Sequence, residues 1–248
     1  MVVINKKRIE IILSCLIIAL FTFSIQIANG KKESYETKEN GQHKTMETTA
    51  SPVSGKTVVL DAGHGVPDEG AQSSNGTTEA ETNLKIALKV QNLLEQSGCN
   101  VILTRSDENA IYDLDSNTLK QKKISDIRNR VKIGNESSAD IFVSIHLNKI
   151  PQSQYYGWQC FYKPNNEQST KLAKQLQENL NKSIQKENKR VAMKLDTVYI
   201  MKHVEIPISI VECGFLSNPE EEKQLLDDSY QNKLAWGIYN GIQEYFYE

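Results

Sequence analysis

The stretch "VVLDAGHG" at residues 58–65 is an apolar run that ends in an acid, two glycines and a histidine. Its apolar residues predict a strand buried on both faces, as in a parallel sheet. The polar residues then lie at the carboxyl end of that strand, where open α/β sheets bind their ligands. The flanking glycines let the backbone turn and come close to a bound group. His64 is therefore the first candidate site residue.

From Lys56 onward, short apolar runs alternate with amphipathic stretches, which predicts one α/β domain over residues 56–248. The expected fold is a three-layer αβα arrangement around a mostly parallel sheet of about six strands. Further strands are expected near residues 99–105, 140–148, 157–162, 198–201 and 208–214. Helices are expected near 79–97, 124–138 and 168–187 and in the closing segment that ends at 246.

The first 30 residues have the pattern of a signal peptide. Lys6, Lys7 and Arg8 precede an apolar stretch at about 11–23, and small residues follow it. This stretch is shorter than the roughly 18 residues expected of a spanning helix, but an uncleaved signal anchor stays open. Residues 31–55 are polar and are expected to form a flexible linker. The sequence therefore predicts an exported protein that meets the membrane only through its N-terminal segment.

Charge and cysteine content narrow the function classes. The net charge is −2, and basic residues are interspersed with acids, so no nucleic-acid partner is expected. The four cysteines show no CxxC pair and no zinc-finger spacing, so no disulfide framework is implied.

Three of the expected strands end in ionisable side chains, namely His64, His146 and Glu212. If these strands are parallel neighbours, the three side chains converge at one edge of the sheet. Glu79 opens the first helix at the same edge, with Glu81 as its nearby alternative. Two imidazoles and a carboxylate can form a hydrolytic zinc site, with a further carboxylate as general base. The alternatives are hydrogen-bonded structural histidines and a glutamate that only complements the helix dipole.

Six motifs occur in one order along the chain: "LDAGHG", "EAETNL", "LTR", "RVKIGN", "FVSIHLN" and "VECGFLSN". With them the chain resembles the zinc-dependent N-acetylmuramoyl-L-alanine amidases, which cleave bacterial peptidoglycan. The resemblance implies that His64, Glu79 and His146 bind one zinc ion and that Glu212 is catalytic. It also implies substrate contacts for Arg105, Arg130 and Asn148. The zinc site is then expected at the carboxyl ends of the strands.

The compact C-terminal ending and the export signal are most similar to germination-specific members from spore formers. This resemblance implies location in the cell wall or in the forespore intermembrane space and cortex, and an activating lipoprotein partner. The chain departs from the family pattern at Val66 and Pro67, where a further small residue is usual after the glycine.

The implied reaction is hydrolysis of the amide between N-acetylmuramic acid and L-alanine. It removes stem peptides on the way to muramic-δ-lactam formation and germination. Two alternatives remain at this stage: a catalytically silent peptidoglycan-binding or scaffolding module, and a zinc carboxypeptidase that acts on stem peptides.

Overall fold

The structure is a computed structural model that describes residues 50–247. The expected export signal at 1–30 and most of the expected linker at 31–55 lie outside the described residues. Folded contacts begin slightly before the expected start at Lys56, because Val53 is fully buried and the Ser51 hydroxyl donates to Gln243. None of the helices within 50–247 is both long and apolar enough to span a membrane.

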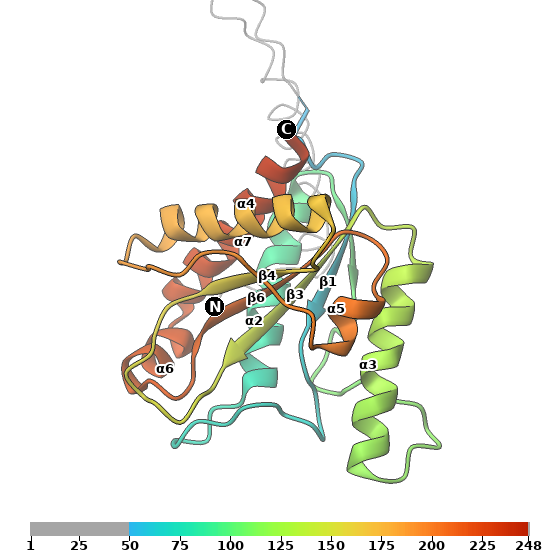
Figure 1. The fold of residues 1–248 in the computed structure, drawn as a ribbon, viewed down its shortest axis with the longest axis vertical. Helices are drawn as coiled ribbons and strands as arrows, with labels where there is room; N and C mark the ends of the chain where they lie inside the picture. The colour runs from blue at the N-terminus through green and yellow to red at the C-terminus, as the bar shows by residue number, and fades with distance from the viewer. Residues whose placement is uncertain (1–49, 248) are drawn as a thin grey trace, which may run out of the picture. The chain divides into compact units, whose positions relative to one another are not determined.

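A six-stranded sheet forms the centre of the domain, in the order β2-β1-β3-β6-β4-β5 (Figure 1). Its strands are β1 (Thr57–Ala62), β2 (Asn100–Leu103), β3 (Ile141–Asn148), β4 (Gln159–Tyr162), β5 (Met193–Lys194) and β6 (Ile208–Phe215). β2, β1, β3 and β6 are parallel neighbours, whereas β4 runs antiparallel to β6 and pairs in parallel with β5. The predicted mostly parallel sheet is confirmed, and β1, β3 and β6 end at the same edge.

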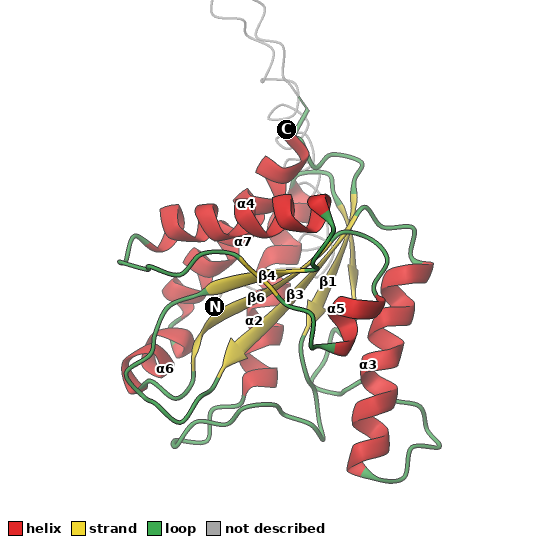
Figure 2. Cartoon of the chain, in the orientation of Figure 1, coloured by secondary structure: helices red, strands yellow, loops and turns green. Residues whose placement is uncertain are grey.

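Helices flank the sheet (Figure 2). They are α2 (Glu79–Gln96), α3 (Leu119–Glu136), α4 (Glu167–Ile184), α5 (Tyr199–His203), α6 (Pro219–Leu226) and α7 (Asp228–Tyr247). Thr78, Thr118, Asn166 and Asn218 cap α2, α3, α4 and α6, each accepting from a free backbone N–H of the first turn. These caps explain why the helices begin where they do.

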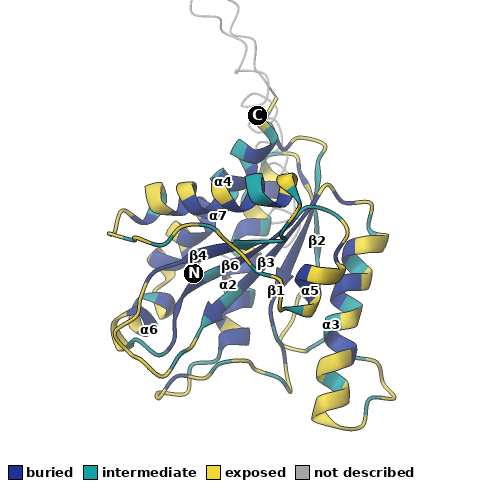
Figure 3. Cartoon of the chain, in the orientation of Figure 1, coloured by how far each residue is buried: buried dark blue, intermediate teal, exposed yellow. Residues whose placement is uncertain are grey.

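Two apolar cores lie on opposite faces of the sheet, as expected for three layers. On one face α2, α4 and α7 cover a core that includes Leu60, Val143 and Cys213. On the other face α3 and α5 cover a core that includes Phe142 and Ile210. Figure 3 shows the strands buried between the helices. Glu212, next to Cys213 in β6, therefore faces the α3 and α5 side.

The expected strand at 198–201 is wrong, because these residues begin the short helix α5. Four apolar or aromatic residues are too few to distinguish the two-residue period of a strand from the 3.6-residue period of a helix. The helical spacing is visible where the Tyr199 and His203 rings stack with centroids 3.8 Å apart. Ile200 and Met201 pack into the core on this face. The strand at this edge of the sheet is the short β5, which pairs with β4 and which the sequence did not predict.

The described cysteines Cys99, Cys160 and Cys213 are free and buried. Burial raises the pKa of each thiol, to about 11 for Cys99, so none of the three is activated as a nucleophile.

Candidate active site

His64 lies on a tight turn directly after β1. It has a φ of 63°, a left-handed conformation that is unusual for a side chain other than glycine. Two buried arginines grip the backbone of this turn. Arg130 Nη2 donates to the carbonyl of His64 at 2.6 Å, and Arg105 Nη2 donates to the carbonyl of Gly63 at 3.1 Å. Asn83 of α2 donates to the same Gly63 carbonyl at 3.2 Å. The surrounding structure therefore holds a strained conformation in place.

His146 reaches the same point from β3. Its imidazole packs against Gly63, where an added Cβ would lie 2.3 Å from Nε2. Only a glycine at this position lets β1 and the imidazole come so close. On the other side of β3, His146 pairs in register with Glu212 of β6.

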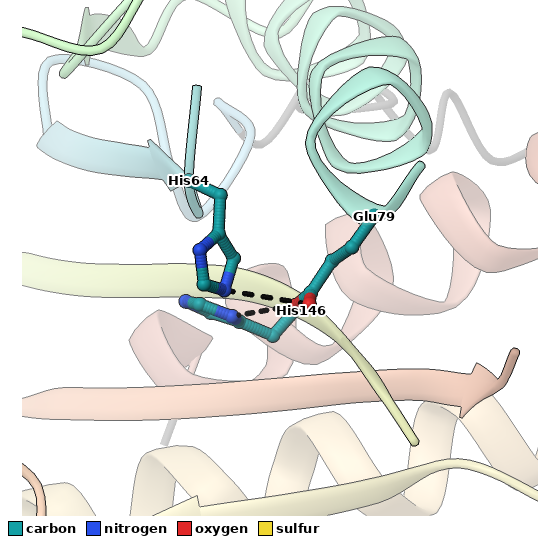
Figure 4. Close-up of side chains that lie close together, drawn as sticks. All are labelled: His64, Glu79 and His146. Atoms are coloured by element: carbon teal, nitrogen blue, oxygen red, sulfur yellow. Dashed lines mark hydrogen bonds and ion pairs between the residues drawn. The ribbon is translucent and has the colours of Figure 1, made fainter. Parts of the chain in front are cut away.

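Glu79 is the third member and begins α2. Its side chain is buried, and its carboxylate contacts both imidazoles from one side (Figure 4). Glu79 Oε1 is 2.9 Å from His146 Nδ1, and Oε2 is 3.4 Å from His64 Nε2. Backbone N–H groups of Leu147 and Ala71 donate to the same two oxygens at 3.0 and 2.8 Å. These contacts fix the carboxylate independently of the imidazoles.

His64, Glu79 and His146 together could hold a metal ion, because one ligand atom from each lies within 4.8 Å of the others. Two nitrogens and one carboxylate oxygen fit zinc, which takes such a set in hydrolytic sites and keeps a further position open. The close approach allowed by Gly63 and by Gly70, where a Cβ would lie 2.6 Å from Glu79 Oε2, brings the donors together.

The electrostatics of the group also favour a cation. Burial would raise the pKa of Glu79, but the hydrogen bonds and charges of His146 and His64 hold it well below its usual range. Burial would lower the pKa of His64, yet its contacts with Asp68 and Glu79 raise it to about 9. The carboxylates therefore attract positive charge to this point, and a metal ion would bind in place of a proton. Asp68, 3.4 Å from His64 Nδ1, orients the ring from outside the group.

Glu212 lies beside the three donors on β6. Its Oε2 is buried and has no hydrogen-bond partner among residues 50–247. Burial raises its pKa to about 7, with the His146 charge opposing the shift and the Glu79 charge adding to it. An unpartnered buried carboxylate is costly, so this atom is placed for a group that the protein itself does not provide.

A pocket of about 280 Å³ joins these residues. His64, His146 and Glu212 line it, together with charged residues that include Lys123 and Arg130. The apolar part of its lining is formed by Ile127, Leu195, Val198, Ile200 and Ile210. A larger hollow of about 650 Å³ lies elsewhere, over α2, α4 and α7. No histidine, cysteine or carboxylate lines that larger hollow, so the chemistry belongs to the smaller pocket.

Arg105 and Arg130, expected to contact substrate, are both buried and bonded within the protein. Arg105 donates to the carbonyls of Ala62, Gly63, Ala80 and Asp107. Arg130 pairs with Asp61 at 2.6 Å and with Asp126 at 2.8 Å, besides holding the His64 carbonyl. Asn148 ends β3, half-buried, and its own carbonyl accepts from Leu216. Arg130 also lines the pocket, whereas Arg105 does not.

The sequence reasoning missed Asp61, which organises this region. The buried carboxylate accepts hydrogen bonds from Arg130 Nη1, from Thr104 at 2.7 Å and from Ser144 at 2.6 Å. A usable signal was present, because an acid inside a buried strand has to be paired.

A group of side chains that could hold a metal ion, with a lone carboxylate beside it at the strand ends, is the arrangement found in hydrolases that activate water on a metal. Residues 58–244 match the family model described as N-acetylmuramoyl-L-alanine amidase. The chain therefore belongs to the N-acetylmuramoyl-L-alanine amidase family, whose members hydrolyse peptidoglycan, and the resemblance seen in the motifs is confirmed.

Relatives of known name agree. The chain is 34% identical over 232 residues to the germination-specific N-acetylmuramoyl-L-alanine amidase of Bacillus subtilis, covering 94% of this chain and 92% of the relative. The CwlD amidase from Clostridioides difficile, solved in complex with the GerS lipoprotein, has 46% identity and a TM-score of 0.75. That match covers 77% of this chain and 98% of the solved one. The catalytic domain of CwlV from Bacillus (Paenibacillus) polymyxa has 32% identity and a TM-score of 0.66, covering 77% and 97%.

Proposed function

We propose that this protein is a zinc-dependent amidase that removes stem peptides from spore cortex peptidoglycan on the way to muramic-δ-lactam formation and germination. The bond cleaved is the amide between N-acetylmuramic acid and L-alanine. The observation that carries the proposal is the convergence of His64, Glu79 and His146 beside the unpartnered Oε2 of Glu212. The germination-specific relative, which is matched over nearly its whole length, supports the cortex as the substrate.

His64, Glu79 and His146 would hold one zinc ion. When bound, zinc would polarise the substrate carbonyl and lower the pKa of a water molecule. Glu212 Oε2 accepts the proton of the attacking water and returns it to the L-alanine nitrogen as that amine leaves. A carboxyl group whose pKa is raised toward neutrality by burial suits both steps.

The buried arginines have a positioning role in this proposal. Arg105 donates to the carbonyl of Gly63, and Arg130 donates to that of His64. These hydrogen bonds fix the turn and keep the His64 imidazole directed at Glu79. Arg130 also lines the pocket and, with Asn148 at the end of β3, is proposed to contact the substrate.

We also propose that the protein is exported through its first 30 residues, with 31–55 as a linker to the catalytic domain. The cell wall and the spore cortex are where its substrate lies. A lipoprotein partner is proposed because the solved CwlD relative forms a complex with the GerS lipoprotein.

The test is hydrolysis of purified cortex peptidoglycan with added zinc, with products read by mass spectrometry and Glu212→Gln run alongside. New L-alanine amino termini that disappear in the variant are the expected result. Release of a C-terminal stem residue would indicate a carboxypeptidase instead. A zinc-loaded protein that forms no product would indicate a silent binding module, and a zinc-free one would direct the search to the partner.

A further inference from the structure

The active-site face of the sheet continues beyond Glu212 onto β4. Gln159 of β4 lies directly opposite Glu212 of β6 in the antiparallel register. Residues directly opposite one another in an antiparallel pair place their side chains on the same face. The Gln159 side chain, which is only 8% exposed, therefore lies next to the proposed catalytic carboxylate.

Arg190 extends this face toward the loop that precedes β4. Its Nη1 donates to Gln159 Oε1 at 3.0 Å, and its Nε donates to the carbonyl of Tyr156 at 3.0 Å. The guanidinium lies 4.6 Å from the centre of the Phe215 ring and 6.0 Å from that of the Tyr155 ring. Through Arg190, Gln159 is thus connected to Tyr155 and Tyr156.

Tyr155 and Tyr156 line a hollow of about 310 Å³ at the outer end of this row. Their exposed fractions are 45% and 42%, high for adjacent aromatic residues. Tyr156 lies three residues before Gln159, about 10 Å of extended chain at 3.3 Å per residue. The Lys186 ammonium lies 4.9 Å from the centre of the Tyr156 ring, so both rings have a cation beside them.

The backbone under these exposed rings is anchored. The loop between β3 and β4 runs beside α6 (Figure 1), and Glu221 of α6 accepts from the N–H groups of Gly157 and Phe215, both at 2.8 Å. Asn218 donates to the carbonyl of Tyr155 at 3.3 Å. Exposed aromatic rings on a fixed backbone are arranged in advance for a ligand, which reduces the entropy lost on binding.

We propose that Tyr155 and Tyr156 form a subsite for the glycan backbone of the substrate. This inference rests on the proposed function and adds where the sugar chain lies. A sugar ring presents a flat face of C–H groups, and the polarised face of an aromatic ring binds such a surface well. Arg190 and Lys186 add positive charge that suits the carboxylates which hydrolysis of the muramyl amide leaves on the glycan. The glycan then leaves the pocket across β4, and the stem peptide lies within the pocket, whose lining includes Ile127 and Val198.

Binding to peptide-free glycan strands tests the subsite without requiring turnover. We expect the dissociation constant of the zinc-supplemented full chain to rise about tenfold when Tyr155 and Tyr156 are both changed to Ala. The double change to Phe keeps the rings and should keep the affinity. Tyr247→Ala, which removes a tyrosine that is 77% exposed on α7, is the matched control and should bind as wild type. Equal binding by the Ala and wild-type proteins would overturn the proposal.

Kinetics then separate this subsite from the activity itself. On glycan strands that carry stem peptides, the double Ala variant should show a KM raised about tenfold and a kcat within twofold of wild type. On a single muramyl peptide, too short to reach the hollow, its KM should be unchanged. A KM raised equally on both substrates would contradict a glycan subsite. A zinc-loaded wild type that binds glycan but releases no L-alanine termini would refute the proposed function and leave the subsite standing.

Discussion

Replacing Asp61 by Asn should weaken the whole domain, although the change removes only a charge. The carboxylate is 1% exposed and faces the 3% exposed Arg130 across 2.6 Å. An Asn side chain can keep its oxygen toward Arg130 and Thr104 and turn its amide toward the Ser144 hydroxyl, so hydrogen bonds survive and the ion pair does not. Breaking a buried pair costs about 3–5 kcal/mol, and the retained hydrogen bonds place Asn near the lower figure, about 3 kcal/mol.

Urea and thermal unfolding measure this loss. For a domain of this size, about 3 kcal/mol corresponds to a melting temperature lowered by about 6–12 °C. Glu81→Gln, which removes an exposed partner of Lys85, is the control and should change the free energy of unfolding by less than about 1 kcal/mol. A loss below about 1 kcal/mol for Asp61→Asn would refute the claim that this buried charge stabilises the fold.

The same variant has a pH signature. Burial would raise the pKa of Asp61, but the Arg130 charge, followed by His146 and the two hydroxyls, lowers it below 3.8. A lowered pKa means that the ion stabilises the folded state fully above the unfolded pKa of about 3.9 and less as the pH falls through the folded value. The stability difference between wild type and Asp61→Asn should therefore shrink below about pH 4.

Three further predictions concern the site. Glu212→Gln should lower kcat by about 10²–10⁴-fold and leave zinc content unchanged, which separates proton transfer from metal binding. Gly63→Ala places a methyl group 2.3 Å from His146 Nε2 and should lower zinc affinity by about 10–100-fold in chelator competition. Gly76→Ala, which meets no atom within 4 Å but strains a backbone with a φ of 90°, should lower stability and leave zinc affinity unchanged. Arg105→Lys keeps the positive charge but loses the branched guanidinium that donates to several carbonyls, so we expect the free energy of unfolding to fall by about 2 kcal/mol. A raised KM at unchanged stability would instead indicate that Arg105 contacts the substrate directly.

The sequence predicted the part of the fold that depends on burial and strand ends. The apolar runs of β1, β3 and β6 were expected as buried strands, and the structure confirms them as parallel neighbours. Once their order is known, the convergence of their carboxyl ends follows from topology alone. The structure brings His64 and His146 together with Glu79, because helix α2 starts at the same edge.

Other features depend on contacts that no local pattern reveals. A four-residue apolar segment at 198–201 cannot distinguish strand from helix, so α5 was mistaken for a strand. The hydrogen bonds of Arg105 go to backbone carbonyls from three separate segments, which spacing along the chain does not show. The antiparallel direction of β4 likewise follows from tertiary packing, since its apolar pattern fits either direction.

Arg105 and Arg130 hold main-chain oxygens at the turn that carries His64, and these contacts affect how the enzyme can be engineered. Every residue has a main-chain carbonyl, whatever its side chain. The hydrogen bonds of Arg105 to the carbonyls of Ala62 and Gly63 therefore do not require particular side chains at the accepting residues. The segment at 66–77 that follows His64 adds contacts of its own, because Asp68 lies 3.4 Å from His64 Nδ1 and the Ala71 N–H donates to Glu79 Oε2. Exchanging it for a loop from another protein therefore has to keep these two contacts and the glycine at position 70. Libraries that keep Asp68, Gly70 and Ala71 and vary the other residues of this segment should retain folded protein while changing which peptidoglycans are cut.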